Sequence, residues 1–125
     1  MLAAYASRDA GLAGLVLVAT APSLSEAIRV RLASRWYLMP LGILPVSRIL
    51  PHDYSLTESL LQPHARDVAI FQGTEDRQVP ISDLDSALSR VQGLRMVQVT
   101  GGTHSTTFPL SRDAQISVIR GMLSQ

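Results

Sequence analysis

The chain contains the stretch Val68-Ala69-Ile70-Phe71-Gln72-Gly73-Thr74-Glu75-Asp76, an apolar run that ends at a glycine and is followed by two acidic residues. A second apolar run, residues 96–100, is followed by Gly101-Gly102-Thr103-His104. Short runs of this kind, rich in β-branched residues, are typical of strands. An acidic turn and a histidine therefore each follow the C-terminal end of a predicted strand. In parallel α/β sheets, functional sites lie at that edge.

A third apolar run, Leu15-Val16-Leu17-Val18-Ala19, lies between Gly14 and Pro22 and predicts a parallel strand covered on both faces. The run at 96–100 alternates more strongly and is expected near an edge of the sheet. Helical segments separate the three predicted strands, so we expect parallel strands joined by right-handed crossovers. The predicted fold class is α/β, with three parallel strands, flanking helices and a short helical cap insertion.

The starts of the helices are predicted from capping boxes. A serine followed three residues later by an acidic residue satisfies the unpaired amide groups of a first helical turn. Three such pairs occur, at Ser23 and Glu26, Ser55 and Glu58, and Ser82 and Asp85. The third pair opens a helix whose apolar stripe is expected to face the sheet, at Leu84, Ala87, Leu88 and Val91. A last helix is expected to be capped by Ser111 and to pack through Ile116, Ile119 and Leu123.

The length of 125 residues fits one domain with a single core, so residues 1–125 are expected to form a single, partial α/β domain. Within it, residues 23–66 are expected to form a cap-like insertion, because Pro40, Pro45 and Pro51 interrupt any long helix there. Residues 2–10 are rich in alanine, and Gly11 follows them. This pattern predicts the tail of a buried helix.

Composition excludes several classes of function. The eleven basic residues are all arginine, are scattered, and are balanced to a net charge of +1, so no nucleic-acid partner is expected. Cysteine is absent, which excludes disulfides and thiol chemistry, and no metal or cofactor is expected. The longest apolar stretch, residues 36–46, is far shorter than the roughly 20 residues that span a bilayer. With no signal-peptide pattern at Met1, we expect a cytoplasmic protein.

Asp76 and His104 are the candidate catalytic residues. In a hydrolytic triad, a carboxylate orients an imidazole that removes a proton from an attacking hydroxyl. Gly101 and Gly102 allow a tight turn that holds the imidazole over the sheet edge. Glu75 is the alternative acid, because a shift of one position would exchange it with Asp76. Taken singly, either residue could instead be an ordinary loop residue, the aspartate capping its own turn.

The other acidic and histidine residues fit the site less well. Asp83 and Asp85 are expected to lie at the start of a helix, where capping explains them. His52 and His64 lie in the insertion without an acidic turn as partner, so a surface or packing role is expected for both.

The pattern Gly73-Thr74-Glu75-Asp76-Arg77-Gln78-Val79-Pro80, followed by Gly101-Gly102-Thr103-His104, resembles the C-terminal third of the α/β-hydrolase family. The three predicted strands are similar to the sixth, seventh and eighth strands of that family. The resemblance implies that Asp76 is the triad acid and His104 the triad base, in the order nucleophile, acid, histidine. The family's nucleophile stands in Gly-x-Ser-x-Gly, which occurs nowhere in this sequence, so the chain contains no nucleophile.

This resemblance implies a hydrolase of ester, thioester or amide bonds, with an apolar acyl or alkyl group in its small-molecule substrate. The nucleophile would be Ser, Asp or Cys. Residues 2–10 would match the helix after the nucleophile, which places the nucleophile upstream of Met1. The strand at 15–18 would then lack a neighbour, and we expect a complementing N-terminal segment or self-association there. One alternative is a vestigial or non-catalytic module that binds through the surface of residues 36–46. Another is that the same residues form a lipid-facing lid.

Overall fold

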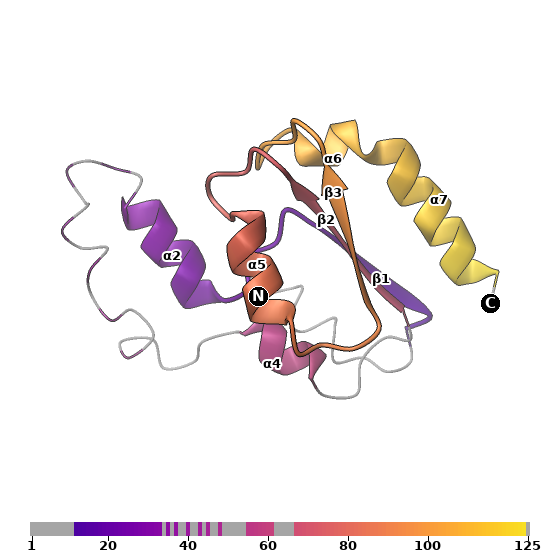
Figure 1. Ribbon diagram of the computed structural model, residues 1–125, viewed down its shortest axis with the longest axis horizontal. Helices are drawn as coiled ribbons and strands as arrows, with labels where there is room; N and C mark the ends of the chain where they lie inside the picture. Colours follow the sequence, from indigo (N-terminus) through magenta and orange to yellow (C-terminus); the bar gives the residue numbers. More distant parts are fainter. Residues whose placement is uncertain are drawn as a thin grey trace.

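A parallel sheet of three strands forms the centre of the computed structural model, which describes residues 12–33, 35, 37, 40, 43, 45, 48, 55–61 and 67–124 (Figure 1). The strands are β1 (Gly14–Val18), β2 (Asp67–Gly73) and β3 (Leu94–Val99), in the order β1-β2-β3. Gly14 of β1 is in register with Asp67 of β2, and Val68 of β2 with Leu94 of β3. The predicted α/β class with three parallel strands is therefore confirmed.

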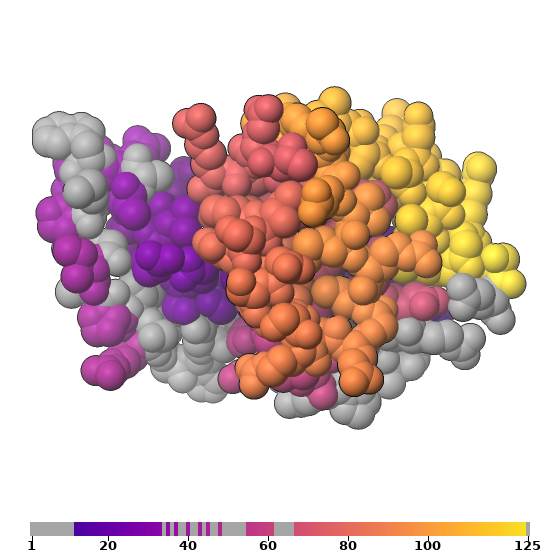
Figure 2. All heavy atoms as spheres, in the orientation of Figure 1, coloured from indigo at the N-terminus to yellow at the C-terminus, as the bar shows by residue number. Residues whose placement is uncertain are grey.

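Five helices occur in the described part of the chain. They are α2 (Leu24–Ala33), α4 (Leu56–Leu60), α5 (Ile81–Leu88), α6 (Thr107–Leu110) and α7 (Arg112–Leu123). Figure 1 shows α4 and α5 on one side of the sheet and α7 on the other. In Figure 2, the orange atoms of α5, of β3 and of the segment between them form the middle of the visible face. The yellow atoms of α7 lie to their right.

The central strand β2 is buried on both faces, and its residues alternate between two apolar clusters. Val68 and Ile70 pack with α4 and α5 through Leu56, Leu60, Leu84 and Leu88. Ala69 and Phe71 pack on the other face with Val99 and, from α7, with Val118 and Met122. Successive side chains of a strand point to opposite faces, so a continuous apolar run is what a strand covered on both sides requires.

Strand β1 is less buried than its sequence predicted. Leu17 is buried, whereas Leu15, Val16 and Val18 are only partly covered. The reason is position: β1 pairs with β2 on one side, and no described strand pairs with its other side. Strand β3 forms the opposite edge, as its alternating pattern predicted.

Two of the three predicted capping boxes are present on their serine side. The hydroxyl oxygen of Ser23 accepts a hydrogen bond from the amide of Glu26, and that of Ser55 accepts one from Glu58. The prediction for Ser82 is wrong: α5 begins at Ile81 with Pro80 as its N-cap, and the Ser82 hydroxyl donates to Asp83 instead. Pro80 has no side-chain group that could accept a capping hydrogen bond from the first turn.

Ser111 is the N-cap residue of helix α7, as expected, but its side chain makes no capping hydrogen bond. The prediction of the packing face of α7 is wrong. Ile116, Ile119 and Leu123 are exposed. Gln115 is buried instead, and Val118 and Met122 pack against the sheet. The buried stripe is therefore offset around the helix from the predicted one. Gln115 can lie inside because its side-chain amide donates to the hydroxyl of Ser111 and to the carbonyl of Phe108.

Several predictions concern residues outside the described part of the chain. These are the helix at 2–10, both His52 and His64, and most of the apolar stretch 36–46. The proposed insertion, residues 23–66, contributes α2 and α4 to the described structure. No helix among the described residues has the length and apolar character needed to cross a bilayer.

Candidate active site

Two loops form the candidate site, one after β2 and one after β3. Because these strands are parallel neighbours, Gly73 and Val99 end at the same edge of the sheet. The loops are joined by backbone hydrogen bonds: the amide of Thr74 donates to the carbonyl of Val99 at 3.0 Å, and the amide of Glu75 donates to that of Gly102 at 2.9 Å. The amide of Gly101 donates in return to the hydroxyl of Thr74 at 2.9 Å. The two loops therefore hold each other in place.

Glycine is required at three positions of this junction. Gly101 has a φ of +69°, in the left-handed region that side chains disfavour. At Gly73, an added Cβ would overlap the carbonyl of Gly102 and the hydroxyl of Thr107. At Gly102, an added Cβ would lie 3.0 Å from the Cα of Gly73. The sequence argument for a tight turn thus applies to Gly101, whereas Gly73 and Gly102 permit the close approach of two backbones.

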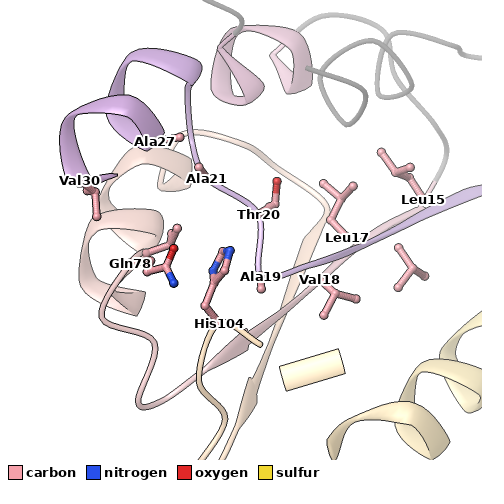
Figure 3. A pocket seen from close by; sticks show the side chains of 12 residues that line it. Leu15, Leu17, Val18, Ala19, Thr20, Ala21, Ala27, Val30, Gln78 and His104 are labelled. Carbon is pink, nitrogen blue, oxygen red and sulfur yellow. The ribbon is translucent and has the colours of Figure 1, made fainter. Parts of the chain in front are cut away.

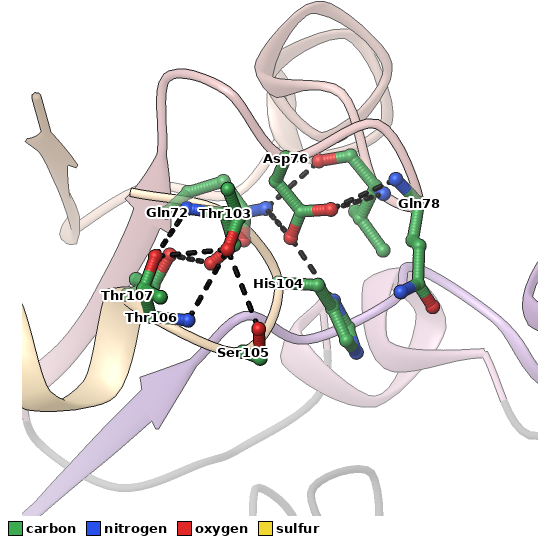
Figure 4. Close-up of polar contacts among 9 residues, drawn as sticks. Gln72, Asp76, Gln78, Thr103, His104, Ser105, Thr106 and Thr107 are labelled. Carbon is green, nitrogen blue, oxygen red and sulfur yellow. Dashed lines mark hydrogen bonds and ion pairs between the residues drawn. The ribbon is translucent and has the colours of Figure 1, made fainter. Parts of the chain in front are cut away.

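Asp76 and His104 lie in contact, as the sequence predicted. Nδ1 of His104 is 3.0 Å from Oδ2 of Asp76 (Figure 4). The side chain of Asp76 is fully buried, whereas that of His104 is 40% exposed. A carboxylate can only accept hydrogen bonds, so the imidazole donates its Nδ1 hydrogen to it. This fixes the neutral ring in the tautomer whose other nitrogen, Nε2, carries a lone pair.

Both oxygens of Asp76 are fully used. Oδ1 accepts from the backbone amides of Gln78 at 2.8 Å and Val79 at 3.0 Å. Oδ2 accepts from the side-chain amide of Gln72 at 2.9 Å, in addition to His104. The aspartate therefore caps its own turn with one oxygen and orients the histidine with the other. The same carboxylate therefore caps its turn and contacts the imidazole.

The loop that carries His104 is closed by threonine side chains. The hydroxyl of Thr107, which is buried, donates to the carbonyl of Thr103. The hydroxyl of Thr106 accepts from the amide of Thr103 at 2.9 Å, and their two hydroxyl oxygens lie 2.8 Å apart. These bonds tie the residues on either side of His104 into the turn before α6. The backbone of the histidine is thus fixed while its ring stays accessible.

His104 faces a groove of about 560 Å³ that runs along β1 (Figure 3). The walls are mainly apolar and come from β1, the segment after it, and α2. In Figure 3, His104 lies between Gln78 and Ala19. The lining residues are Leu15, Val16, Leu17, Val18, Ala19, Thr20, Ala21, Ala27, Val30, Gln78, Val79 and His104. The groove therefore offers an apolar wall next to a single imidazole.

The other acidic candidates have different positions in the structure. Glu75, the alternative acid, is exposed, and its backbone joins the two loops. Asp83 lies in the first turn of α5, and Asp85 lies further along the same helix. Among the described residues, no group of three or more His, Asp or Glu side chains is placed to hold a metal ion.

Gln72 is the residue that sequence reasoning missed. It is the only polar side chain between Val68 and Gly73, it is fully buried, and it contacts the carboxylate of Asp76 directly. A signal was present, since a long amide at the end of an apolar buried strand needs a hydrogen-bond partner. The acidic turn directly after this strand, with Glu75 and Asp76, contains the nearest possible partners in the sequence.

Comparisons of the chain with models of protein families, with curated proteins and with solved structures gave no match.

Proposed function

We propose that this chain carries the acid and the base of a hydrolase of the α/β-hydrolase type, acting on ester, thioester or amide bonds. The contact between Nδ1 of His104 and the buried Oδ2 of Asp76 is the observation that supports this proposal. In this arrangement, a buried carboxylate fixes the tautomer of an imidazole whose other nitrogen is accessible. A general base for an attacking hydroxyl needs those two properties.

In this proposal, the two residues have different roles. Nε2 of His104 would take the proton from a nucleophile as its oxygen or sulfur attacks the acyl carbon. The imidazolium that forms would be stabilised by Asp76, which stays ionised, and Nε2 would then return the proton to the leaving group. Because the carboxylate is held by four donors, it would not need to reorganise during either step.

The nucleophile in this proposal comes from polypeptide outside the printed sequence, because no Gly-x-Ser-x-Gly motif occurs in it. The β1 edge is the place where such a segment would pair, since no described strand occupies its outer side. His104 is one of the residues that line the groove along β1, so a segment paired with the outer side of β1 would lie near the imidazole.

An apolar acyl or alkyl group is the proposed substrate feature. The walls of the groove near His104 include Ala21, Ala27, Val30 and Val79, and Gln78 is the polar side chain beside the imidazole. Apolar walls with few polar groups are typical of sites that bind small apolar ligands. The polar end would then hold the reacting carbonyl.

The test is turnover of p-nitrophenyl butyrate by the chain alone and by the chain mixed with the polypeptide encoded directly upstream of Met1. We expect turnover only in the mixture, and its loss in His104→Ala. The matched control, His52→Ala, should retain turnover. Equal loss in both variants, or an upstream frame that lacks a nucleophile motif, would contradict the proposal.

A non-catalytic binding module is the second candidate function. The observation that favours it is the absence of a nucleophile motif from the sequence together with an apolar groove that could still hold a ligand. In that case, an apolar ester should bind the chain without being cleaved. Binding should also survive His104→Ala, because the apolar residues that line the groove remain.

A further inference from the structure

Gln72 is a fully buried polar side chain near the end of β2, and it contacts the loop that follows the strand. Its Nε2 donates to Oδ2 of Asp76 at 2.9 Å and to the carbonyl of Val79 at 2.8 Å. Its carbonyl oxygen, Oε1, is buried and has no hydrogen-bond partner. An unpaired buried carbonyl costs stability, and an apolar side chain at this position would avoid that cost. The amide group is therefore present for its two donated bonds.

The orientation of this amide has only one acceptable state. Turning it by half a rotation would place Oε1 against Oδ2 of Asp76 and the carbonyl of Val79, both of which are acceptors. Both hydrogens of Nε2 are thus directed at fixed partners. The side chain is fully buried and lies at the end of a strand that is covered on both faces, so it has no room to rearrange.

The contact with Oδ2 fixes the plane of the Asp76 carboxylate. The amides of Gln78 and Val79 hold Oδ1 at one point, but a group held at one oxygen can still rotate and move the other. Gln72 holds Oδ2 at a second point, so the plane is determined. The remaining lone-pair direction of Oδ2 is then the one that meets Nδ1 of His104.

We propose that Gln72 is a positioning residue for His104: by holding Oδ2 of Asp76, it selects the Nδ1–H tautomer of the imidazole. This inference rests on the proposed relay between Asp76 and His104 and extends it by one residue. Gln72 touches neither the groove nor the imidazole in any described contact, so its effect is transmitted through the carboxylate alone.

The test is ¹⁵N NMR of the full chain with labelled histidine at alkaline pH, where each neutral ring shows which nitrogen carries the hydrogen. His104→Gln identifies the signals of His104. In the unchanged chain, we expect Nε2 of His104 to resonate as an unprotonated nitrogen. In Gln72→Met, which has similar length but no donor, the population with hydrogen on Nε2 should rise several-fold. Gln72→Glu should have the same effect.

Two controls separate positioning from stability. Gln98 is the register partner of Gln72 on β3 but is exposed, so Gln98→Met should leave the tautomer unchanged. Ile70 lies two residues earlier on the same face of β2, so Ile70→Ala should lower stability without changing the tautomer. With the complementing segment, Gln72→Met should lower kcat up to about a hundredfold and leave KM unchanged.

The outcomes distinguish this inference from the relay itself. An unprotonated Nε2 that persists in both Gln72→Met and Gln72→Glu overturns the role of Gln72 and leaves the relay intact. A protonated Nε2 in the unchanged chain overturns the relay. If neither Gln72 variant folds, Gln72 is a structural residue of the loop and the positioning role is rejected.

Discussion

Gly73 at the end of β2 and Gly102 in the loop after β3 lie with their backbones in direct contact, and neither position has room for a side chain. The contact brings together two loops that are separated by nearly thirty residues in the sequence. It also sets the distance between Asp76, three residues after Gly73, and His104, two residues after Gly102. The geometry of the candidate relay thus depends on two residues that perform no chemistry.

Gly73→Ala should therefore destabilise the chain and separate the two loops. The new methyl group would overlap a carbonyl that is fixed by its bond to Glu75, and overpacking of this kind costs about 1–3 kcal/mol. Urea unfolding gives the stability. The ¹⁵N spectrum of His104 reports the loss of its contact with Asp76.

Gly121→Ala is the matched control. Gly121 lies in α7, is exposed, and has nothing near the site of an added Cβ. Alanine in a helix interior is favoured over glycine by roughly 0.5–1 kcal/mol, so this variant should be slightly more stable. Equal destabilisation in both variants would show that the Gly73 contact is not tight.

Asp76→Asn tests which of the two adjacent acidic residues is used. An asparagine at this buried position offers one oxygen and two hydrogens to four donors, and each stranded buried donor costs roughly 1–3 kcal/mol. We expect a large loss of unfolding free energy and of turnover in the complemented system.

Glu75→Gln should change neither quantity, because Glu75 is exposed and exposed substitutions usually stay within about 0.5 kcal/mol. Unfolding curves and initial rates on an activated ester measure both effects. Greater loss of turnover in Glu75→Gln than in Asp76→Asn would transfer the role of the acid to Glu75.

The strands were the most predictable part of the fold, because each contains a short run rich in apolar, β-branched residues. The exception within β2 is Gln72, and the sequence does not reveal which way its amide points. The hydrogen-bond partners of a side chain across a sheet or a turn depend on the register of the strands. That register is set only when the strands pair. For the same reason, the sequence placed Asp76 and His104 at one edge but did not show that one carboxylate would serve both turn and histidine.

The helices were less predictable where two apolar faces compete. Residues 112–123 contain Ile116, Ile119 and Leu123 on one face and Val118 and Met122 on another, so amphipathic spacing alone allows either face to pack. The structure resolves the choice through Gly14 of β1, where an added Cβ would meet the side chain of Met122. A small residue on the sheet thus leaves room for Met122 on the buried face of α7.

The hydroxyl of Thr74 provides a separate link between the loops, and Thr74→Val should remove it. The lost bond from the amide of Gly101 is partly replaced by water at this exposed place, so the expected cost is about 0.5–1.5 kcal/mol. Thr74→Ser keeps the hydroxyl and should cost less. Thermal unfolding distinguishes the two, and a Val variant as stable as the Ser variant would show that the bond contributes nothing.

Substitutions on α7 test which of its faces is buried. Met122→Ala removes a side chain that packs on the cluster of Ala69, Phe71 and Val99 and covers Gly14, so it should lower stability by about 1–3 kcal/mol, less than the loss for a fully buried methionine. Leu123→Ala removes an apolar group of similar size that is 74% exposed, and its effect should stay within about 0.5 kcal/mol. Urea unfolding of both variants measures the difference. A greater loss for Leu123→Ala would mean that the outer face of α7 is covered in solution, and its dependence on protein concentration would then show whether a second copy of the chain covers it.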